Sequence, residues 1–430
     1  MRLQCLLSPI GTQSKKPEII STLSYCEIDM IITDSSYLCL LDSVLDEYEY
    51  GVNMILMDTQ EIIRNKSGKS YIEKCNCDTT NDVAIMLHTS GTTSNPKRVM
   101  LTHSNLINNI ESNIHSLALT SNDKACITLP IYFGYCNTAQ FLTHLYLGGV
   151  IIMVNGIFIP RQFFKLVEEE KITNYTCVPS TLLTLLKYNY MDNYDYNSLR
   201  YICFGGGRMP TDKLAQLIEK FPSIGFVQTY GQTECSPRIT ALMPEYSLEK
   251  IGSVGKAIPN VEIKIVNNMG IEVHDSQVGE IIVRGKSTML GYYKQPEETS
   301  QVIRNGWVHT GDLGYVDNDG FLFLIGRIKN IIISGGINIY PEEVELVILQ
   351  HECIIDVCVI GVDDMLLGEV PIAKVILKYE IPESELMRYC SERLSKYKIP
   401  VRFEAVKAIP KTYNGKIKRG TKNNRSLERH

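Results

Sequence analysis

The chain has 430 residues, of which 44% are hydrophobic and 21% charged, and its formal net charge is −5. This length leaves room for about two or three domains with a large buried core, and the composition is ordinary for a globular enzyme. The slight negative charge gives no reason to expect nucleic acid as a partner. The 13 cysteines are scattered and odd in number, which indicates reduced thiols and a cytoplasmic location.

Near the N-terminus, two near-continuous apolar runs at residues 28–34 and 52–58 predict parallel strands that are buried on both faces. Residues 82–89 predict a third strand of this kind, and residues 103–117 have helical spacing. Residues 125–160 carry no charge, but polar side chains and the pair Gly148 and Gly149 interrupt them. We therefore expect buried α/β core there, and no transmembrane segment.

Strand-then-loop patterns recur at residues 200–207 and 225–234, with a helix between them. After Gly252, short strands separated by turns predict a smaller β-rich subdomain. The pattern changes again near Arg327, and beyond it we expect a helix opening with Pro341, two apolar strands, an amphipathic helix and a basic tail. This predicts two domains, residues 1–326 and 327–430.

A hydroxyl-rich segment follows the strand predicted at residues 82–89. It contains Thr89, Ser90, Gly91, Thr92, Thr93, Ser94, Pro96 and Lys97. Hydroxyls, free backbone N–H groups and a lysine suit a polyphosphate, and open α/β sheets bind ligands at the carboxyl ends of their strands. The segment is no P-loop, because Pro96 takes the place of the second glycine and Arg98 follows Lys97. A Ser/Thr-rich surface turn is the alternative.

A second polar segment, Tyr230-Gly231-Gln232-Thr233-Glu234, follows a later predicted strand. Tyr230 can stack on a base, and Thr233 can donate a hydrogen bond to a phosphate. A triphosphate would repel the Glu234 carboxylate unless a divalent cation bridged them, so this placement implies Mg²⁺ with Glu234 as its ligand.

Four further segments belong to the same pattern: residues 204–207, residues 310–312, residues 326–329 with 334–336, and residues 409–419. Together these motifs resemble the AMP-forming adenylating enzymes, which include acyl-CoA synthetases, nonribosomal adenylation domains and luciferases. The resemblance extends from about Ile19 to Arg419. It implies an α/β fold. A large N-terminal domain, with parallel-type sheets, helices and a small β subdomain, would precede a small mobile α+β C-terminal domain. The first βαβ portion of the large domain is expected to be missing, because the hydroxyl-rich segment lies unusually early.

The resemblance also implies the role of each motif. Catalytic roles fall to Lys416, Thr233 and Glu234. The hydroxyl-rich segment with Lys97 would bind the phosphates, and adenine would lie against Gly205, Gly206, Gly207, Tyr230 and Gly231. Asp312 and Arg327 would bind the ribose, and Gly335 and Gly336 would line the site of a pantetheine arm. Lys329 would be the pivot between the two domains. Arg98 stands where many relatives have glycine, and we expect it to add positive charge to the phosphate loop.

The implied reaction is activation of a small carboxylic acid by ATP and Mg²⁺, giving an acyl-adenylate and pyrophosphate, followed by thioester formation with coenzyme A. Two alternatives remain open. The acyl group could be loaded onto the phosphopantetheine of a separate carrier protein, or the chain could be a non-catalytic nucleotide-binding relative. The sequence does not identify the acid.

Overall fold

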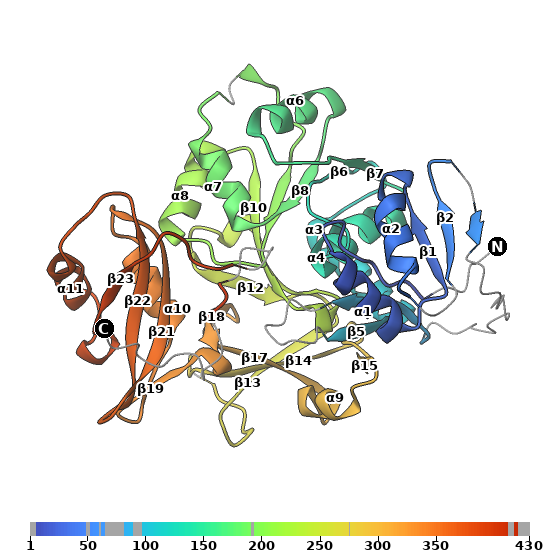
Figure 1. The fold of residues 1–430 in the computed structure, drawn as a ribbon. Helices are drawn as coiled ribbons and strands as arrows, with labels where there is room; N and C mark the ends of the chain where they lie inside the picture. The colour runs from blue at the N-terminus through green and yellow to red at the C-terminus, as the bar shows by residue number, and fades with distance from the viewer. Residues whose placement is uncertain are drawn as a thin grey trace.

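The computed structural model describes residues 6–48, 52–59, 62–64, 81–88, 97–190, 193–274, 276–411 and 417–419. Figure 1 shows a large body, coloured blue to yellow, and beside it a smaller orange-to-red body formed by the C-terminal part of the chain. Among the described residues, no helix is long and apolar enough to cross a membrane.

In the described residues, the first unit of the large body is a three-stranded sheet with two helices. Strand β1 (Met30–Thr33) pairs in parallel with β2 (Asn53–Leu56), and β3 (Ile62–Arg64) pairs antiparallel with β2. Helices α1 (Lys16–Cys26) and α2 (Leu38–Leu45) share its apolar cluster. The predicted parallel pairing is confirmed, whereas burial on both faces is wrong for β1, because Met30 and Ile32 are 44% and 58% exposed.

A second small sheet flanks the hydroxyl-rich segment. Strand β4 (Val83–His88) pairs antiparallel with β5 (Arg98–Thr102), which pairs antiparallel with β15 (Gly291–Tyr292). The expected parallel strand is therefore wrong here. The connection between β4 and β5 is too short for the crossover that parallel strands require. The helix predicted next is confirmed as α3 (His103–Leu117), capped by the Thr102 hydroxyl.

The central sheet has 12 strands in the described residues. Its parallel part has the order β7-β6-β8-β9-β10. The strands are β6 (Lys124–Ile127), β7 (Val150–Met153), β8 (Asn174–Cys177), β9 (Tyr201–Phe204) and β10 (Gly225–Gly231). Helices α6 (Pro160–Glu170), α7 (Pro179–Lys187) and α8 (Thr211–Lys220) lie beside it in Figure 1 and share one apolar cluster with β8 and β9.

Antiparallel strands extend the same sheet beyond β10, in the order β11-β12-β18-β17-β14-β13, with β16 paired to β17. The strands are β11 (Arg238–Leu242), β12 (Ser253–Ala257), β13 (Val261–Val266), β14 (Gly279–Gly285), β16 (Ile303–Arg304), β17 (Trp307–Val316) and β18 (Leu322–Arg327), and α9 (Pro296–Val302) precedes β16. The predicted β-rich subdomain is thus continuous with the parallel sheet.

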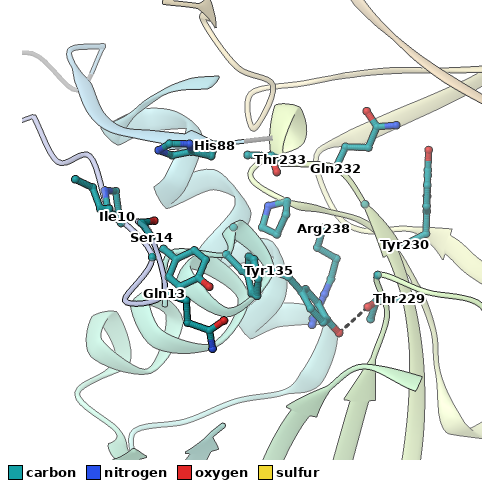
Figure 2. A pocket seen from close by; sticks show the side chains of 18 of the residues that line it. Ile10, Gln13, Ser14, His88, Tyr135, Thr229, Tyr230, Gln232, Thr233 and Arg238 are labelled. Carbon is teal, nitrogen blue, oxygen red and sulfur yellow. Dashed lines mark hydrogen bonds between the residues drawn. The ribbon is translucent and has the colours of Figure 1, made fainter. Parts of the chain in front are cut away.

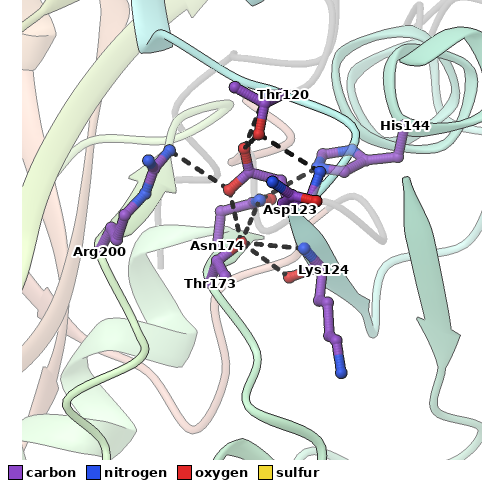
Figure 3. Close-up of polar contacts among 8 residues, drawn as sticks. Thr120, Asp123, Lys124, His144, Thr173, Asn174 and Arg200 are labelled. Carbon is purple, nitrogen blue, oxygen red and sulfur yellow. Dashed lines mark hydrogen bonds and ion pairs between the residues drawn. The ribbon is translucent and has the colours of Figure 1, made fainter. Parts of the chain in front are cut away.

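Buried polar contacts hold the uncharged segment in the core. It forms α4 (Gly134–Cys136), a π-helix η2 (Asn137–Leu142) and α5 (Thr143–Leu147) between β6 and β7. His144 Nδ1 lies 2.8 Å from the Gln140 carbonyl oxygen, and its Nε2 lies 3.0 Å from Asn174 Nδ2. Figure 3 shows this histidine close to Asp123, whose carboxylate accepts a 2.7 Å hydrogen bond from the Thr173 hydroxyl. The expectation of buried core is confirmed for η2, whereas β7 is an exposed edge of the sheet.

As far as the structure describes it, the small body is a five-stranded sheet with helices, as expected beyond Arg327. It comprises β19 (Ile332–Ser334), β20 (Ile337–Ile339), α10 (Pro341–Leu349), β21 (Ile354–Asp364), β22 (Gly368–Leu377), α11 (Glu383–Ser391) and β23 (Phe403–Ala405). The central sheet ends with β18 at Arg327, and this separate sheet begins at Ile332. We keep the domain boundary between residues 326 and 327 as a proposal that this change of sheet supports.

Candidate active site

The carboxyl ends of β9 and β10 bring the glycine segment and the tyrosine segment together. A Cβ atom on Gly205 would lie 2.6 Å from the carbonyl oxygen of Thr229, and Gly206 has a φ of +77°. A Cβ on Gly231 would lie 1.8 Å from the Pro237 carbonyl oxygen. Glycine at 205 and 231 is therefore required by neighbouring backbone, whereas a Cβ on Gly207 would make only ordinary contact, 3.5 Å from Pro179.

Asp312 is the centre of a buried hydrogen-bond group on β17. Its Oδ2 accepts hydrogen bonds from the Tyr230 hydroxyl at 2.8 Å and from Gln232 Nε2 at 2.7 Å, while Arg327 Nε lies 2.7 Å from Oδ1. Asp312 and Tyr230 are 6% and 8% exposed. Burial, then the neighbouring Asp312 charge, raises the pKa of the Tyr230 hydroxyl, so that it remains a donor. The structure thus joins three of the predicted ligand residues.

Glu234 lies in a 3₁₀ turn, η4 (Thr233–Cys235), directly after β10. The Tyr292 hydroxyl donates a 2.9 Å hydrogen bond to Glu234 Oε1, and Lys97 Nζ lies 4.6 Å from the centre of the Tyr292 ring. Tyr292 therefore connects the predicted phosphate lysine with the predicted metal ligand. No motif in the sequence singles out Tyr292, although the pairing of β15 with β5 places it there.

This donor set fits magnesium. Among the described residues, no group of three or more His, Cys, Asp or Glu side chains could hold a metal ion alone. Mg²⁺ usually takes one or two protein carboxylates together with phosphate oxygens of the substrate and water. The carboxylate of Glu234 suits that mode of binding.

The remaining predicted residues belong to the junction and the small body. Lys329 is in the 3₁₀ turn η6 (Ile328–Asn330), and burial, then the nearby Arg327 charge, lowers the pKa of its ammonium. Gly335 and Gly336 have φ values of +55° and +80° in the turn between β19 and β20. The role of these two glycines in binding a pantetheine arm stays a prediction.

Residues 89–94 and Lys416 lie outside the described residues, so their predicted roles are untested. The ends of both segments are nevertheless fixed. His88 is the register partner of Arg98 across β4 and β5, and Lys411 forms an isolated antiparallel bridge with Ile417. Both predicted loops thus begin and end at paired backbone.

The contacts of the Arg98 side chain contradict the prediction that this residue adds positive charge to the phosphate loop. Its side chain is buried, with Nε 3.3 Å from Cys26 Sγ and Nη2 donating to the Thr22 hydroxyl at 2.9 Å, and Nη1 contacts His88. The guanidinium connects β5 to helix α1 and does not contribute the free positive charge that we expected in the phosphate loop.

A pocket of about 370 Å³ opens beside these groups. Figure 2 shows His88 and Thr233 on one side of it and Tyr135, Thr229 and Arg238 on another. Further lining comes from the N-terminal residues Pro9, Ile10, Gly11, Gln13, Ser14 and Glu18, from Tyr132, Phe133 and Gly134, and from Gly206, Tyr230, Gly231, Gln232 and Pro237. The tyrosine segment therefore borders a space of the size that small organic ligands occupy.

Two family models match the chain. The model described as AMP-binding enzyme matches residues 1–293, and the model described as AMP-binding enzyme C-terminal domain matches residues 343–416. The chain therefore belongs to the AMP-binding enzyme family, as its motifs predict.

Curated relatives and solved structures agree with this assignment. The chain is 35% identical over 382 residues to 2-succinylbenzoate–CoA ligase of Bacillus subtilis (strain 168), covering 88% of this chain and 76% of the relative. It is 35% identical over 341 residues to feruloyl-CoA synthase of an Amycolatopsis species, covering 79% and 69%. The Bacillus subtilis O-succinylbenzoate coenzyme A synthetase structure in complex with ATP and magnesium ion gives a TM-score of 0.83 at 31% identity, covering 97% of this chain and 83% of that chain.

These similarities confirm the expected fold and class. The chain is an AMP-forming acid–thiol ligase that activates a carboxylic acid with ATP and magnesium and forms a thioester with coenzyme A. A large N-terminal domain and a small C-terminal domain carry this activity.

Proposed function

We propose that both half-reactions take place where the pocket meets the Asp312 group, and that the predicted residues act there as follows. The observation that supports this best is the convergence of Tyr230, Gln232 and Arg327 on the buried carboxylate of Asp312. Gln232 stands two residues before Glu234 along the chain. A carboxylate is the group that commonly binds a ribose diol. Asp312 would accept the ribose hydroxyls while its neighbours hold it in place.

Adenine would lie against Tyr230 and the backbone of residues 205–207, and the phosphates against the hydroxyl-rich segment, Thr233 and Lys97. A magnesium ion bound by Glu234 would neutralise part of the phosphate charge. Tyr292 would orient that carboxylate through its hydrogen bond.

In the first half-reaction, a carboxylate oxygen of the acid bonds to the α-phosphorus of ATP, and the bond from that phosphorus to pyrophosphate breaks. The two reacting groups are both anionic, so a fixed cation lowers the cost of bringing them together. We assign this cation to the ammonium of Lys416.

In the second half-reaction, the thiol of coenzyme A bonds to the acyl carbon, the bond to AMP breaks, and the thiol proton passes to solvent. Rotation of the small domain about Lys329 would replace Lys416 with the turn at Gly335 and Gly336, against which the pantetheine arm would lie. A few residues at the end of an element can absorb such a rotation.

The test follows AMP and acyl-CoA by mass spectrometry with the purified chain, ATP, magnesium, coenzyme A and a panel of fatty, aryl and dicarboxylic acids. Acid-dependent formation of both products supports the proposal. Adenylate without thioester, relieved by a phosphopantetheinylated carrier protein, would favour the carrier alternative. ATP binding without either product would favour a non-catalytic relative. A cytoplasmic location stays a proposal that rests on the scattered, odd-numbered cysteines.

A further inference from the structure

The segment Thr310-Gly311-Asp312 forms a β-bulge in the pairing of β17 with β14. On β17, residues 310–312 lie opposite a single residue of β14, Ile281, where the register of the two strands shifts. A bulge bends its strand, removes backbone groups from the ladder and re-aims a side chain, and bulges are common beside active sites. The bulge therefore determines the direction in which the Asp312 side chain leaves β17.

The side chain of Glu280, on β14, holds the middle of this bulge. Its Oε1 accepts a 3.1 Å hydrogen bond from the backbone N–H of Gly311, whose φ is +68°. A backbone N–H that leaves the ladder needs another partner, and a carboxylate is a strong acceptor. Glycine adopts such a left-handed φ readily, because it has no Cβ atom. Glu280 thus fixes the residue directly before Asp312.

Two further groups support the same arrangement. Glu280 Oε2 lies 2.8 Å from His309 Nδ1, and these two side chains are 19% and 15% exposed. The Thr310 hydroxyl donates a 2.7 Å hydrogen bond to the Ile281 carbonyl oxygen and accepts one of 3.1 Å from the Asp312 N–H. Both oxygens of Glu280 therefore contact groups of β17, which holds its carboxylate in one orientation.

The bulge connects this support to the nucleotide site. Asp312 is the register partner of Arg327 on β18. Its carboxylate accepts hydrogen bonds from Tyr230 and Gln232, and Gln232 Nε2 also donates to the Thr310 carbonyl oxygen at 2.9 Å. A displacement of about 1 Å in a positioned group can lower the rate by about 100-fold. The function of the Asp312 carboxylate thus depends on the backbone that carries it.

We propose that Glu280 is a positioning residue for the ribose of ATP: it acts through Gly311 to hold Asp312 where the carboxylate can accept both ribose hydroxyls. This role rests on the proposed function, because it requires Asp312 to bind the ribose. Loss of Glu280 should therefore weaken the binding of nucleotides that carry these hydroxyls and spare nucleotides that lack them.

A competing explanation limits Glu280 to the stability of the β14–β17 pair. In that case Glu280→Ala would lower the midpoint of thermal unfolding but would leave the preference for one nucleotide over another unchanged. The ratio of two nucleotide affinities separates the two explanations, because a loss of folded protein affects both affinities equally.

The test compares ATP with 2′,3′-dideoxyATP, which lacks both ribose hydroxyls, in the wild type, Glu280→Ala, Glu280→Gln and Asp312→Asn. Calorimetric titration measures the Kd of each nucleotide with magnesium, and acid-dependent acyl-CoA formation measures KM and kcat. Glu262→Ala is the matched control, because Glu262 lies on the next strand, β13, and forms an exposed ion pair with Arg284.

We expect the wild type and Glu262→Ala to prefer ATP. In Glu280→Ala, the Kd and KM for ATP should rise by about 10-fold, while kcat and the Kd for 2′,3′-dideoxyATP should stay within about two-fold. Glu280→Gln keeps an acceptor oxygen for the Gly311 N–H and should retain most of the preference. Added to Asp312→Asn, Glu280→Ala should change the ratio little further, because both substitutions act through the same contact.

An unchanged ratio of the two dissociation constants in Glu280→Ala, with a wild type that prefers ATP, would overturn the positioning role and leave the proposed function intact. Equal binding of both nucleotides by the wild type, or binding of neither, would instead count against the assignment of Asp312 to the ribose and would overturn the positioning role with it. If Glu280→Ala does not fold, Glu280→Asp replaces it with the same two outcomes, because its shorter side chain withdraws the acceptor from the Gly311 N–H.

Discussion

Arg327 Nε lies 2.7 Å from Asp312 Oδ1, so the last residue of β18 is joined to the carboxylate that we assign to the ribose. The Asp312 charge is the main cause of the raised pKa of this guanidinium. Since β18 is the last strand before the small body, the position of the ribose ligand depends on the junction between the two domains.

Asp312→Asn should weaken ATP binding. The amide keeps the shape of the side chain but removes its charge and places an N–H group where an acceptor is needed. Charge-assisted hydrogen bonds contribute about 1.5–3 kcal/mol, so the KM for ATP should rise by about 10- to 100-fold. Asp319→Asn, on the exposed turn after β17, is the control. An unchanged KM would show that Asp312 does not contact the nucleotide.

Tyr292→Phe should raise the magnesium concentration needed for half-maximal activity. The phenylalanine ring still faces Lys97, but the 2.9 Å hydrogen bond to Glu234 is lost. A net contribution of about 1 kcal/mol predicts a change of about five-fold. The neighbouring Tyr293→Phe serves as the control. Equal magnesium dependence in the two variants would contradict a positioning role for Tyr292.

Gly231→Ala should destabilise the large domain and abolish activity. Its Cβ would meet the Pro237 carbonyl oxygen at 1.8 Å, and that atom belongs to the backbone beside Arg238. Forcing atoms into such a site costs about 1–3 kcal/mol or more. Gly207→Ala is the control for stability, because its Cβ would make ordinary contact at 3.5 Å. Thermal unfolding of the two variants measures the difference, and equal midpoints would refute the close approach.

Glu345 predicts a pH dependence of stability. Burial raises the pKa of its carboxyl from 4.5 to about 7, although Arg419 lies 2.6 Å away and opposes the rise. A folded-state pKa above the unfolded value means that the folded protein binds more protons between these values. Its contribution to the free energy of unfolding is therefore greatest below about pH 4.5 and is lost as the pH rises toward about 7.

Thermal melts from pH 5 to 8 should show this loss in the wild type relative to Glu345→Gln, whose side chain does not titrate. Parallel pH profiles for the two proteins would show that Glu345 remains ionised beside Arg419 throughout this range.

Sequence patterns predicted the local elements better than their pairing. Helix α3 and the helix opening at Pro341 lie where periodicity and start signals placed them. The direction of β4 was predicted wrongly, because an apolar run has the same appearance in parallel and antiparallel strands. The short connection to β5 indicates the antiparallel pairing, because a parallel pair requires a longer crossover.

In the candidate site too, the sequence predicted single residues better than the contacts between them. Motifs identified Asp312, Tyr230 and Glu234 as candidates, because each stands in a string of residues that is characteristic of the family. They did not reveal Tyr292, since its hydrogen bond to Glu234 joins segments that are distant in sequence. Arg98 was misjudged because helix α1 supplies its partners.

The most direct test of the central claim separates the two half-reactions in Lys416→Ala, with Lys418→Ala from the same tail as the control. Acid-dependent exchange of labelled pyrophosphate into ATP reports the first half-reaction, and thioester formation from a supplied acyl-adenylate reports the second. We predict that Lys416→Ala lowers exchange by about 10²–10³-fold while thioester formation changes far less, since one preorganised cation is lost from the first transition state. Exchange at the wild-type rate in Lys416→Ala would contradict the account.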